Sequence, residues 1–204
     1  MTTLPFPPLP APAGYTWRPF QADDVRALQQ LEQACGPVDG ATYLRTAVEW
    51  QAVIQEASFS QTAVNSAGQV AAVGWLTFDD RVDSVHAFHF GRVQPDFRGQ
   101  GIGSALLGWL EATAVPRLRE MAAGRPTFLR TYFYDRGPDA INLLSASGYQ
   151  RQYAEDELRL DLRRPVPTAV FGVETAVHHW TPAHADDFYA AYRAAFATRT
   201  TSLL

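Results

Sequence analysis

The apolar positions of this chain change between helical and strand spacing several times. Residues 15–20 are typical of a short strand, and Val25, Leu28 and Leu31 then recur at helical spacing behind a pair of aspartates. A second helical pattern begins at Ala41. The chain is therefore predicted to open with one strand and two helices.

The middle of the chain carries alternating apolar residues, which are typical of strands. Two predicted strands flank a turn over residues 65–68, and a long strand rich in aromatic residues starts at Ser84. A helix follows a glycine-rich loop, and Pro116 is expected to kink or end that helix.

The pattern then predicts a strand from Pro126, a short helix that Gly148 ends, and a hairpin-like pair of strands from Tyr149. The full order is strand, two helices, three strands, helix, strand, helix and two strands. This order predicts a mixed α/β (α+β) fold, because strands and helices do not alternate strictly.

One stretch of the sequence occurs twice. TWRPFQADDVRAL aligns with HWTPAHADDFYAA at one constant offset, so that Trp17 falls on Trp180 and Pro19 on Pro182. Such repeats suggest duplication, although a proline-acidic helix start also recurs by chance. We divide the chain into a proline-rich tail (1–14), a main domain (15–164) and a terminal segment (165–204). The terminal segment is expected to form a packed strand and helix, as the start of a second repeat or as a docked arm that pairs two copies into a homodimer.

Composition and charge narrow the class of protein. The 204 residues are 47% hydrophobic with a net charge of −4, and lysine is absent, so arginine supplies the positive charge. An acidic chain without a basic cluster is a poor nucleic-acid binder. The single cysteine, Cys35, excludes an internal disulfide and a cysteine-based metal site. No apolar run reaches membrane-spanning length and no signal peptide is evident, so we expect a cytoplasmic protein without a metal.

Three glycines, Gly99, Gly101 and Gly103, stand where the long strand passes into its helix. A helix start offers unpaired N–H groups, and glycines let an anion approach that backbone closely. The stretch predicts a phosphate cradle. No Gly-Lys-Ser/Thr follows, which excludes a Walker loop, and Ser104 and the residues after the strand fit a dinucleotide fingerprint poorly. A pyrophosphate outside the Rossmann class fits better.

The stretch RVQPDFRGQGIGSALL resembles motif A of the GNAT superfamily of acyl-CoA N-acyltransferases. Val93 and Pro95 stand where the family's fourth strand ends, and Arg98, Gly101 and Gly103 fill the loop pattern. The resemblance implies a central, mostly antiparallel sheet flanked by helices. It further implies that the backbone of seven residues holds the pyrophosphate of acetyl-CoA, while the N–H of Val93, beside a strand bulge, polarises the thioester carbonyl. The seven residues are Arg98, Gly99, Gln100, Gly101, Ile102, Gly103 and Ser104.

The family's mechanism, transferred by resemblance, is direct attack of a deprotonated amine on the thioester. His89 is the candidate base because it shares a strand face with Val93 and its ordinary pKa suits proton transfer; His86, on the other face, is the weaker alternative. The resemblance places Leu144 where many members carry an acid tyrosine, and Leu144 cannot donate a proton. Tyr132, Tyr134, water or solvent would have to replace it.

The acceptor is expected to be a primary amine of a small molecule or peptide. Candidate lining residues are Asp39, Tyr43, Trp50, Tyr132, Tyr134 and Asp135. A non-catalytic, acyl-CoA-binding or regulatory half of a tandem GNAT protein is the alternative function, motivated by Leu144 and by the partial repeat. A nucleotide-binding oxidoreductase is the third class considered.

Overall fold

The computed structural model describes residues 12, 14–134, 136–155, 158, 160–165, 168, 176 and 178–196. The chain divides into two units, residues 1–152 and 153–204, which are described separately. The first unit contains a five-stranded sheet in the order β1-β2-β3-β4-β5. Its strands are β1 (Tyr15–Arg18), β2 (Phe59–Asn65), β3 (Val70–Asp80), β4 (Val85–Val93) and β5 (Thr127–Arg130); its helices are α1 (Val25–Asp39), α2 (Ala47–Glu56), α3 (Ile102–Ala122) and α4 (Pro138–Ala146), with 3₁₀ turns η1 (Ala22–Asp24) and η2 (Pro95–Phe97).

The sheet is antiparallel except between β4 and β5, which run parallel. The predicted turn between β2 and β3 is confirmed, and the Asn65 side chain closes it by accepting the N–H groups of Ala67 and Gln69. The mixed, mostly antiparallel architecture predicted from the sequence is confirmed. The parallel pair follows from α3, because a crossover helix returns the chain to the same edge of the sheet.

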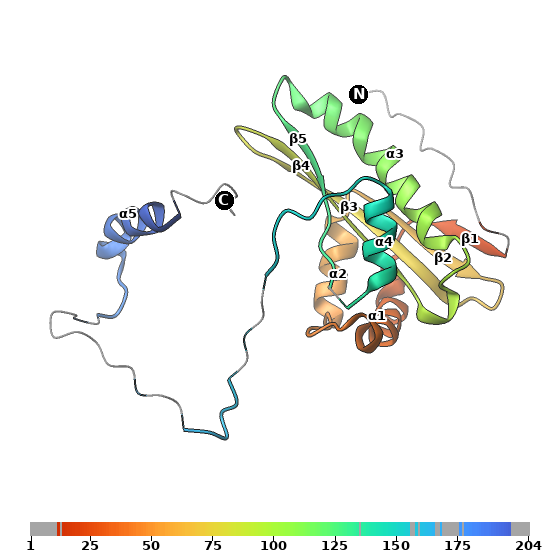
Figure 1. The fold of residues 1–204 in the computed structure, drawn as a ribbon, viewed down its shortest axis with the longest axis horizontal. Helices are drawn as coiled ribbons and strands as arrows, with labels where there is room; N and C mark the ends of the chain where they lie inside the picture. The colour runs from red at the N-terminus through yellow and green to blue at the C-terminus, as the bar shows by residue number, and fades with distance from the viewer. Residues whose placement is uncertain are drawn as a thin grey trace. The chain divides into compact units, whose positions relative to one another are not determined.

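Helices α1 and α2 cover one face of the sheet (Figure 1). Leu28 and Leu31 are buried and Val25 packs beside them, so the predicted apolar face of α1 is confirmed. The Arg18 guanidinium forms a bidentate ion pair with Asp24, which joins β1 to the start of α1. Thr46 and Glu49 form a capping box that fixes where α2 begins.

Helix α3 covers the opposite face (Figure 1). Its predicted apolar stripe is buried against the sheet: Ile102, Leu106, Trp109, Leu110 and Thr113. Leu106 reaches the sheet where β3 and β4 carry glycines. A Cβ on Gly74 would lie 2.7 Å from Leu106 Cδ1, and one on Gly91 would lie 3.4 Å from Leu106 Cδ2. The missing side chains let α3 approach the sheet closely.

Pro116 does not end α3, because the helix continues to Ala122. Proline removes the hydrogen bond to the carbonyl four residues earlier, here that of Ala112. Ala112 and Pro116 both lie on the exposed side of the helix, while Ala114 and Leu118 are buried on the sheet. Packing on both sides of the proline therefore keeps the helix continuous.

The short helix before Gly148 is confirmed as α4. Gly148 has a φ of 87°, and the N–H of Tyr149 then bonds the Leu144 carbonyl, which closes the helix end. The hairpin expected from Tyr149 is wrong, since none of the described residues between Tyr149 and Leu162 is in a strand. Leu158, Leu160 and Leu162 are exposed, so the alternating pattern has no apolar face to bury.

The second unit contains a 3₁₀ turn, η3 (Pro182–His184), followed by α5 (Ala185–Phe196). The predicted helix is confirmed, and both copies of the repeated stretch pass through a 3₁₀ turn into a helix. Most of the predicted strand FGVETAVHHW lies outside the described residues. The tandem interpretation, docking of this segment and homodimer formation stay predictions.

Two glycine substitutions should shift stability in opposite directions. Gly74→Ala forces a methyl group against buried Leu106 and should destabilise the fold by about 1–3 kcal/mol. Gly108→Ala meets no atom within 4 Å on the exposed side of α3 and should stabilise it by about 0.5–1 kcal/mol. Urea unfolding measures both. A Gly74→Ala variant that is as stable as wild type or more stable would contradict the close helix–sheet approach at Gly74.

Candidate active site

Strand β5 forms one edge of the sheet, and it separates from β4 partway along β4. Their pairing ends at Phe88 and Arg130, whereas β4 continues to Val93. The Gln94 N–H bonds the Ala71 carbonyl of β3, so antiparallel alternation turns the N–H groups of Gly91 and Val93 away from β3. These two N–H groups therefore border the opening between β4 and β5.

The strand bulge expected beside Val93 is wrong. The β3–β4 register runs without a shift from the Ala72–Val93 pair to the Asp80–Val85 pair. The opening arises instead because β5 stops after four residues. The same register adds Gly91, which the sequence analysis missed; the position of Gly91 two residues before Val93 on one strand face was the available signal.

The loop after β4 presents its backbone to solvent. Gly99 and Gly101 have φ values of 75° and 81°, a conformation that favours glycine, and nothing lies within 4 Å of a Cβ built on either. The Ala105 N–H makes the first helical bond, to the Gly101 carbonyl. In the part of the chain that the structure describes, no hydrogen bond uses the N–H groups from Gly99 to Ser104. They are available donors at the positive end of α3.

Arg98 braces this loop. Its backbone N–H bonds the Pro95 carbonyl, so the free donors begin at Gly99. The Arg98 Nε donates to the Val93 carbonyl at 3.0 Å, and its terminal nitrogens reach the two Asp39 oxygens at 2.8 and 2.9 Å. Cys35 Sγ also lies 3.5 Å from the Val93 carbonyl. The end of α1 and the loop before α3 are thereby joined.

His89 is the first β4 residue beyond the pairing with β5. It points to the α3 face, as Val93 does, and its side chain is 3% exposed. Its Nε2 is buried without a hydrogen-bond partner among the described residues. Burial lowers the pKa of His89 to about 4, so the imidazole is neutral at neutral pH.

Tyr149 packs edge-on against His89, with ring centroids 5.4 Å apart. Burial, reinforced by the nearby Glu111 carboxylate, raises the pKa of Tyr149, so the phenol keeps its proton. The alternative base, His86, lies within the paired part of β4 on the other face, with Nε2 3.0 Å from Ser84 Oγ. Leu144 is buried in α4 and offers no proton.

The residues predicted to line the acceptor site each make a different contact in the structure. Trp50 is fully buried in the core, Asp39 pairs with Arg98, and the Tyr43 hydroxyl bonds Glu49. Tyr132 stacks on Phe88, with ring centroids 5.9 Å apart. Tyr134 is partly buried after β5, and Asp135 lies outside the described residues.

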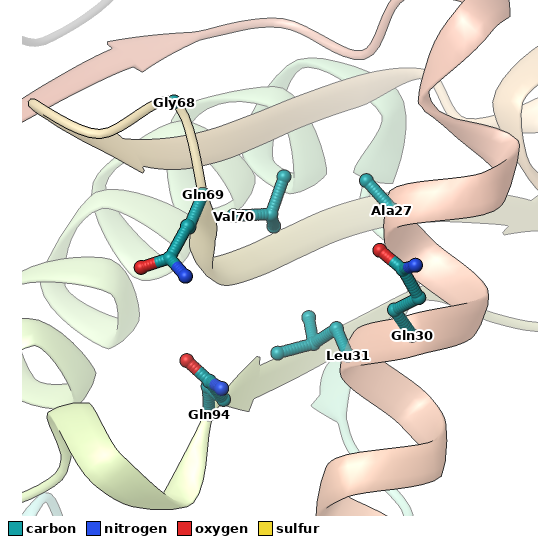
Figure 2. A pocket seen from close by; sticks show the side chains of 7 residues that line it. All are labelled: Ala27, Gln30, Leu31, Gly68, Gln69, Val70 and Gln94. Carbon is teal, nitrogen blue, oxygen red and sulfur yellow. The ribbon is translucent and has the colours of Figure 1, made fainter.

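A pocket of about 250 Å³ lies between α1, the β2–β3 turn and the end of β4. Figure 2 shows Gln69 and Gln94 extending toward it from the turn and the strand end, with Leu31 of α1 opposite. None of the residues predicted for the site lines this pocket, and the opening between β4 and β5 is a different place.

The family model of the acetyltransferase (GNAT) family matches residues 25–127, which span α1 through the first residue of β5 and include the glycine loop. The chain belongs to the GNAT acetyltransferase family. The match covers α1, the opening at β4 and the N-terminus of α3, which are the parts of this GNAT chain that form the site described above. No curated protein matches the chain.

Solved structures share the GNAT fold with this chain. A GCN5-related N-acetyltransferase from Sphaerobacter thermophilus is 23% identical over 68% of this chain, with a TM-score of 0.57. This chain spans only 44% of that protein's length. A phosphinothricin acetyltransferase from Sinorhizobium meliloti, in complex with AcCoA, is 20% identical over 69% of this chain and 77% of its own, with a TM-score of 0.51. Among the described residues, no helix is long and apolar enough to cross a membrane.

Acidification should destabilise this GNAT domain through His89. The folded pKa of about 4 lies below the ordinary value of 6.5, so the unfolded chain binds the proton more tightly. The stability held by the neutral imidazole is complete above pH 6.5 and is lost as the pH falls toward 4. The loss is on the order of 3 kcal/mol. Urea unfolding at several pH values should show a shallower dependence for His89→Leu than for wild type; identical slopes would place His89 in contact with water.

Proposed function

We propose that this chain transfers an acetyl group from acetyl-CoA to a primary amine of a small molecule or peptide. The observation that carries the proposal is the set of N–H groups from Gly99 to Ser104, which have no hydrogen-bond partner among the described residues and follow η2 after β4, a strand whose own N–H groups border an opening. The N–H groups of the loop suit a pyrophosphate, and those of Gly91 and Val93 suit a thioester carbonyl. Acetyl transfer by a GNAT protein requires both kinds of group close together in the chain.

The pyrophosphate is proposed to bind at the start of α3. The space in front of Gly99 and Gly101 is open, and the N–H groups around them have no partner among the described residues. Arg98 is proposed to act by holding the loop, since Asp39 and the Val93 carbonyl engage its guanidinium. Ile102 anchors the loop by burying its side chain beside Ala63 and Ala72.

The thioester carbonyl is proposed to accept hydrogen bonds from the N–H groups of Val93 and Gly91. Donors fixed in a strand are already oriented when negative charge develops on that oxygen, so they stabilise the transition state at little cost in reorganisation. The amine nitrogen forms a bond to the carbonyl carbon, and the carbon–sulfur bond then breaks. The thiolate that leaves takes up one proton, and the amine loses one.

His89 is proposed as the group that accepts the amine proton. It lies where β4 and β5 separate, it is neutral at neutral pH, and its Nε2 has no partner in the described part of the chain. The amine has to enter the opening between the strands to reach it, because the side chain points to the α3 face. With a pKa of about 4 the imidazole is unprotonated over the whole neutral range, and as a weak base it passes the proton on to solvent after accepting it.

Leu144 supports the alternative of a non-catalytic acyl-CoA-binding half of a tandem protein. Its side chain is buried in α4 at the place where resemblance calls for an acid. A thiol-release assay over a panel of amines separates the two functions, because a non-catalytic domain binds acetyl-CoA and releases no CoA.

Acetyl-CoA should bind at the α3 N-terminus, and Gly103→Glu should remove this binding. A carboxylate there repels the pyrophosphate, whereas Gly103→Ala places a methyl group at an ordinary 3.5 Å from Leu143 Cδ2. At a hundredfold excess over its dissociation constant, acetyl-CoA should stabilise wild type and Gly103→Ala by about 2.7 kcal/mol. Wild-type affinity of Gly103→Glu in calorimetric titration would refute the phosphate site, and equal stabilisation by NAD would favour the oxidoreductase class.

His89→Gln should lower kcat/KM by about 10²–10⁴ while acetyl-CoA affinity stays unchanged. Because burial lowers the pKa of His89 to about 4, the wild-type rate per concentration of unprotonated amine should fall only as the pH approaches that value, not near 6.5. Initial rates between pH 4.5 and 8, measured on the folded protein, check this. A variant whose rate and pH profile match those of wild type would exclude His89 as the base.

A further inference from the structure

Two arginines converge on one buried carboxylate on the α1–α2 face of the sheet. Glu32 of α1 is 1% exposed, and Arg45 and Arg92 both form ion pairs with it, at 2.8 and 3.3 Å. The three groups together carry one positive charge in a chain whose net charge is −4. The Glu49 carboxylate also interacts electrostatically with Arg45, so Arg92 is the arginine of the two with less opposing charge.

Arg45 is already engaged. Glu32 accepts the Arg45 backbone N–H at 2.9 Å and its terminal Nη1 at 2.8 Å, and Trp50 Nε1 donates at 2.9 Å. The Arg45 guanidinium also lies over the rings of Trp50 and Trp75, 5.3 and 5.6 Å from their centroids. The carboxylate is thus saturated by Arg45 and Trp50, and these contacts fix the loop between α1 and α2.

Arg92 is not engaged in the same way. Its contact with Glu32 is the longest of the set and uses one nitrogen, Nη2. No other hydrogen bond or ion pair holds its Nε or Nη1 within the described part of the chain. The side chain retains 15% exposure. Nη1 is free within the described part of the chain, and with the second N–H of Nη2 it offers the planar end-on pair of donors that matches a carboxylate.

The place of Arg92 connects it to the proposed chemistry. It lies on β4 between Gly91 and Val93, whose N–H groups border the opening. Its side chain points to the α1–α2 face, because Val73 and Trp75 on the neighbouring strand pack there with α1 and α2. The glycine loop opens α3, which covers the opposite face. Arg92 is therefore positioned toward the acceptor rather than toward the phosphates.

We infer that the acceptor is an amine that also carries a carboxylate, as amino acids do, and that Arg92 binds this carboxylate. The inference rests on the proposed function, since it assigns the substrate class of the same site. Glu32 acts as a positioning residue: it holds the Arg92 guanidinium from one side, through Nη2, and leaves Nη1 of Arg92 available to the ligand. The ion pair also keeps the arginine charge from being isolated when the site is empty.

The test compares α-amino acids with their carboxamides, which keep the amine and the side chain and replace the carboxylate by a neutral group. Because the amide also lowers the pKa of the α-amine, rates are compared per concentration of unprotonated amine. Wild type should acetylate the acids with a kcat/KM about tenfold to a hundredfold above that for the amides, the range of a hydrogen-bonded charge contact. Arg92→Gln should bring this ratio close to one while the KM for acetyl-CoA stays unchanged. Arg92→Lys should retain part of the preference, and Arg117→Gln, on the outer side of α3 paired with Glu120, is the matched control that should retain all of it.

The outcomes separate the inference from the function on which it rests. Turnover of amides and acids at equal rates by wild type overturns the inference and leaves the acetyltransferase assignment intact. A rise in the KM for acetyl-CoA in Arg92→Gln, with the acid preference unchanged, assigns Arg92 to the phosphates and also overturns it. No acetyl transfer to any amine by a wild type that binds acetyl-CoA overturns the proposed function itself. A circular dichroism spectrum of each variant that matches wild type establishes that the fold is retained.

Discussion

The early end of β5 is the constraint on which the site depends. A strand that paired with β4 along its full length would consume the N–H groups of Gly91 and Val93 in the ladder. Because pairing stops at Phe88, the sheet has an internal edge with donors but no partner strand. Gly91 is exposed and Val93 is partly exposed, so a ligand or water can satisfy the donors of this edge. The proposed roles of His89, Arg92 and the glycine loop all depend on how close these residues are in sequence to the unpaired part of β4.

The glycines of the domain divide into two physical kinds. At Gly74 and Gly91 a larger residue is disfavoured, because Leu106 of α3 occupies the space where a side chain would lie. Gly99 and Gly101 have open space around them and a positive φ, so the backbone conformation requires glycine. The first kind sets how near α3 lies to the sheet, and the second shapes the backbone at its N-terminus. Together they place the helix dipole at the end of β4.

Local patterns predicted most of the fold, and long-range contacts account for what they missed. The period of Val25, Leu28 and Leu31, the turn at residues 65–68 and the helix stop at Gly148 each depend on neighbours in sequence, and each is confirmed. The engagement of Arg98 by Asp39 and the convergence of Arg45 and Arg92 on Glu32 join residues 13 to 60 positions apart, which no periodicity encodes. At two places a local signal was misleading. Packing against the sheet keeps α3 continuous through Pro116, and the described residues after Tyr149 form no strand despite their alternating pattern.

The ion pair between Arg98 and Asp39 joins the loop before α3 to the C-terminal end of α1. One end of this link belongs to the segment proposed to bind the phosphates, and the other leads into the loop that carries Arg45, on the side proposed for the acceptor. Ordering either segment lowers the entropy that remains to be lost in ordering the other. Binding free energies coupled in this way are reciprocal, so each substrate raises the affinity for its partner by the same factor. In the proposed function, the link therefore favours a ternary complex in which both substrates are bound before any bond is made.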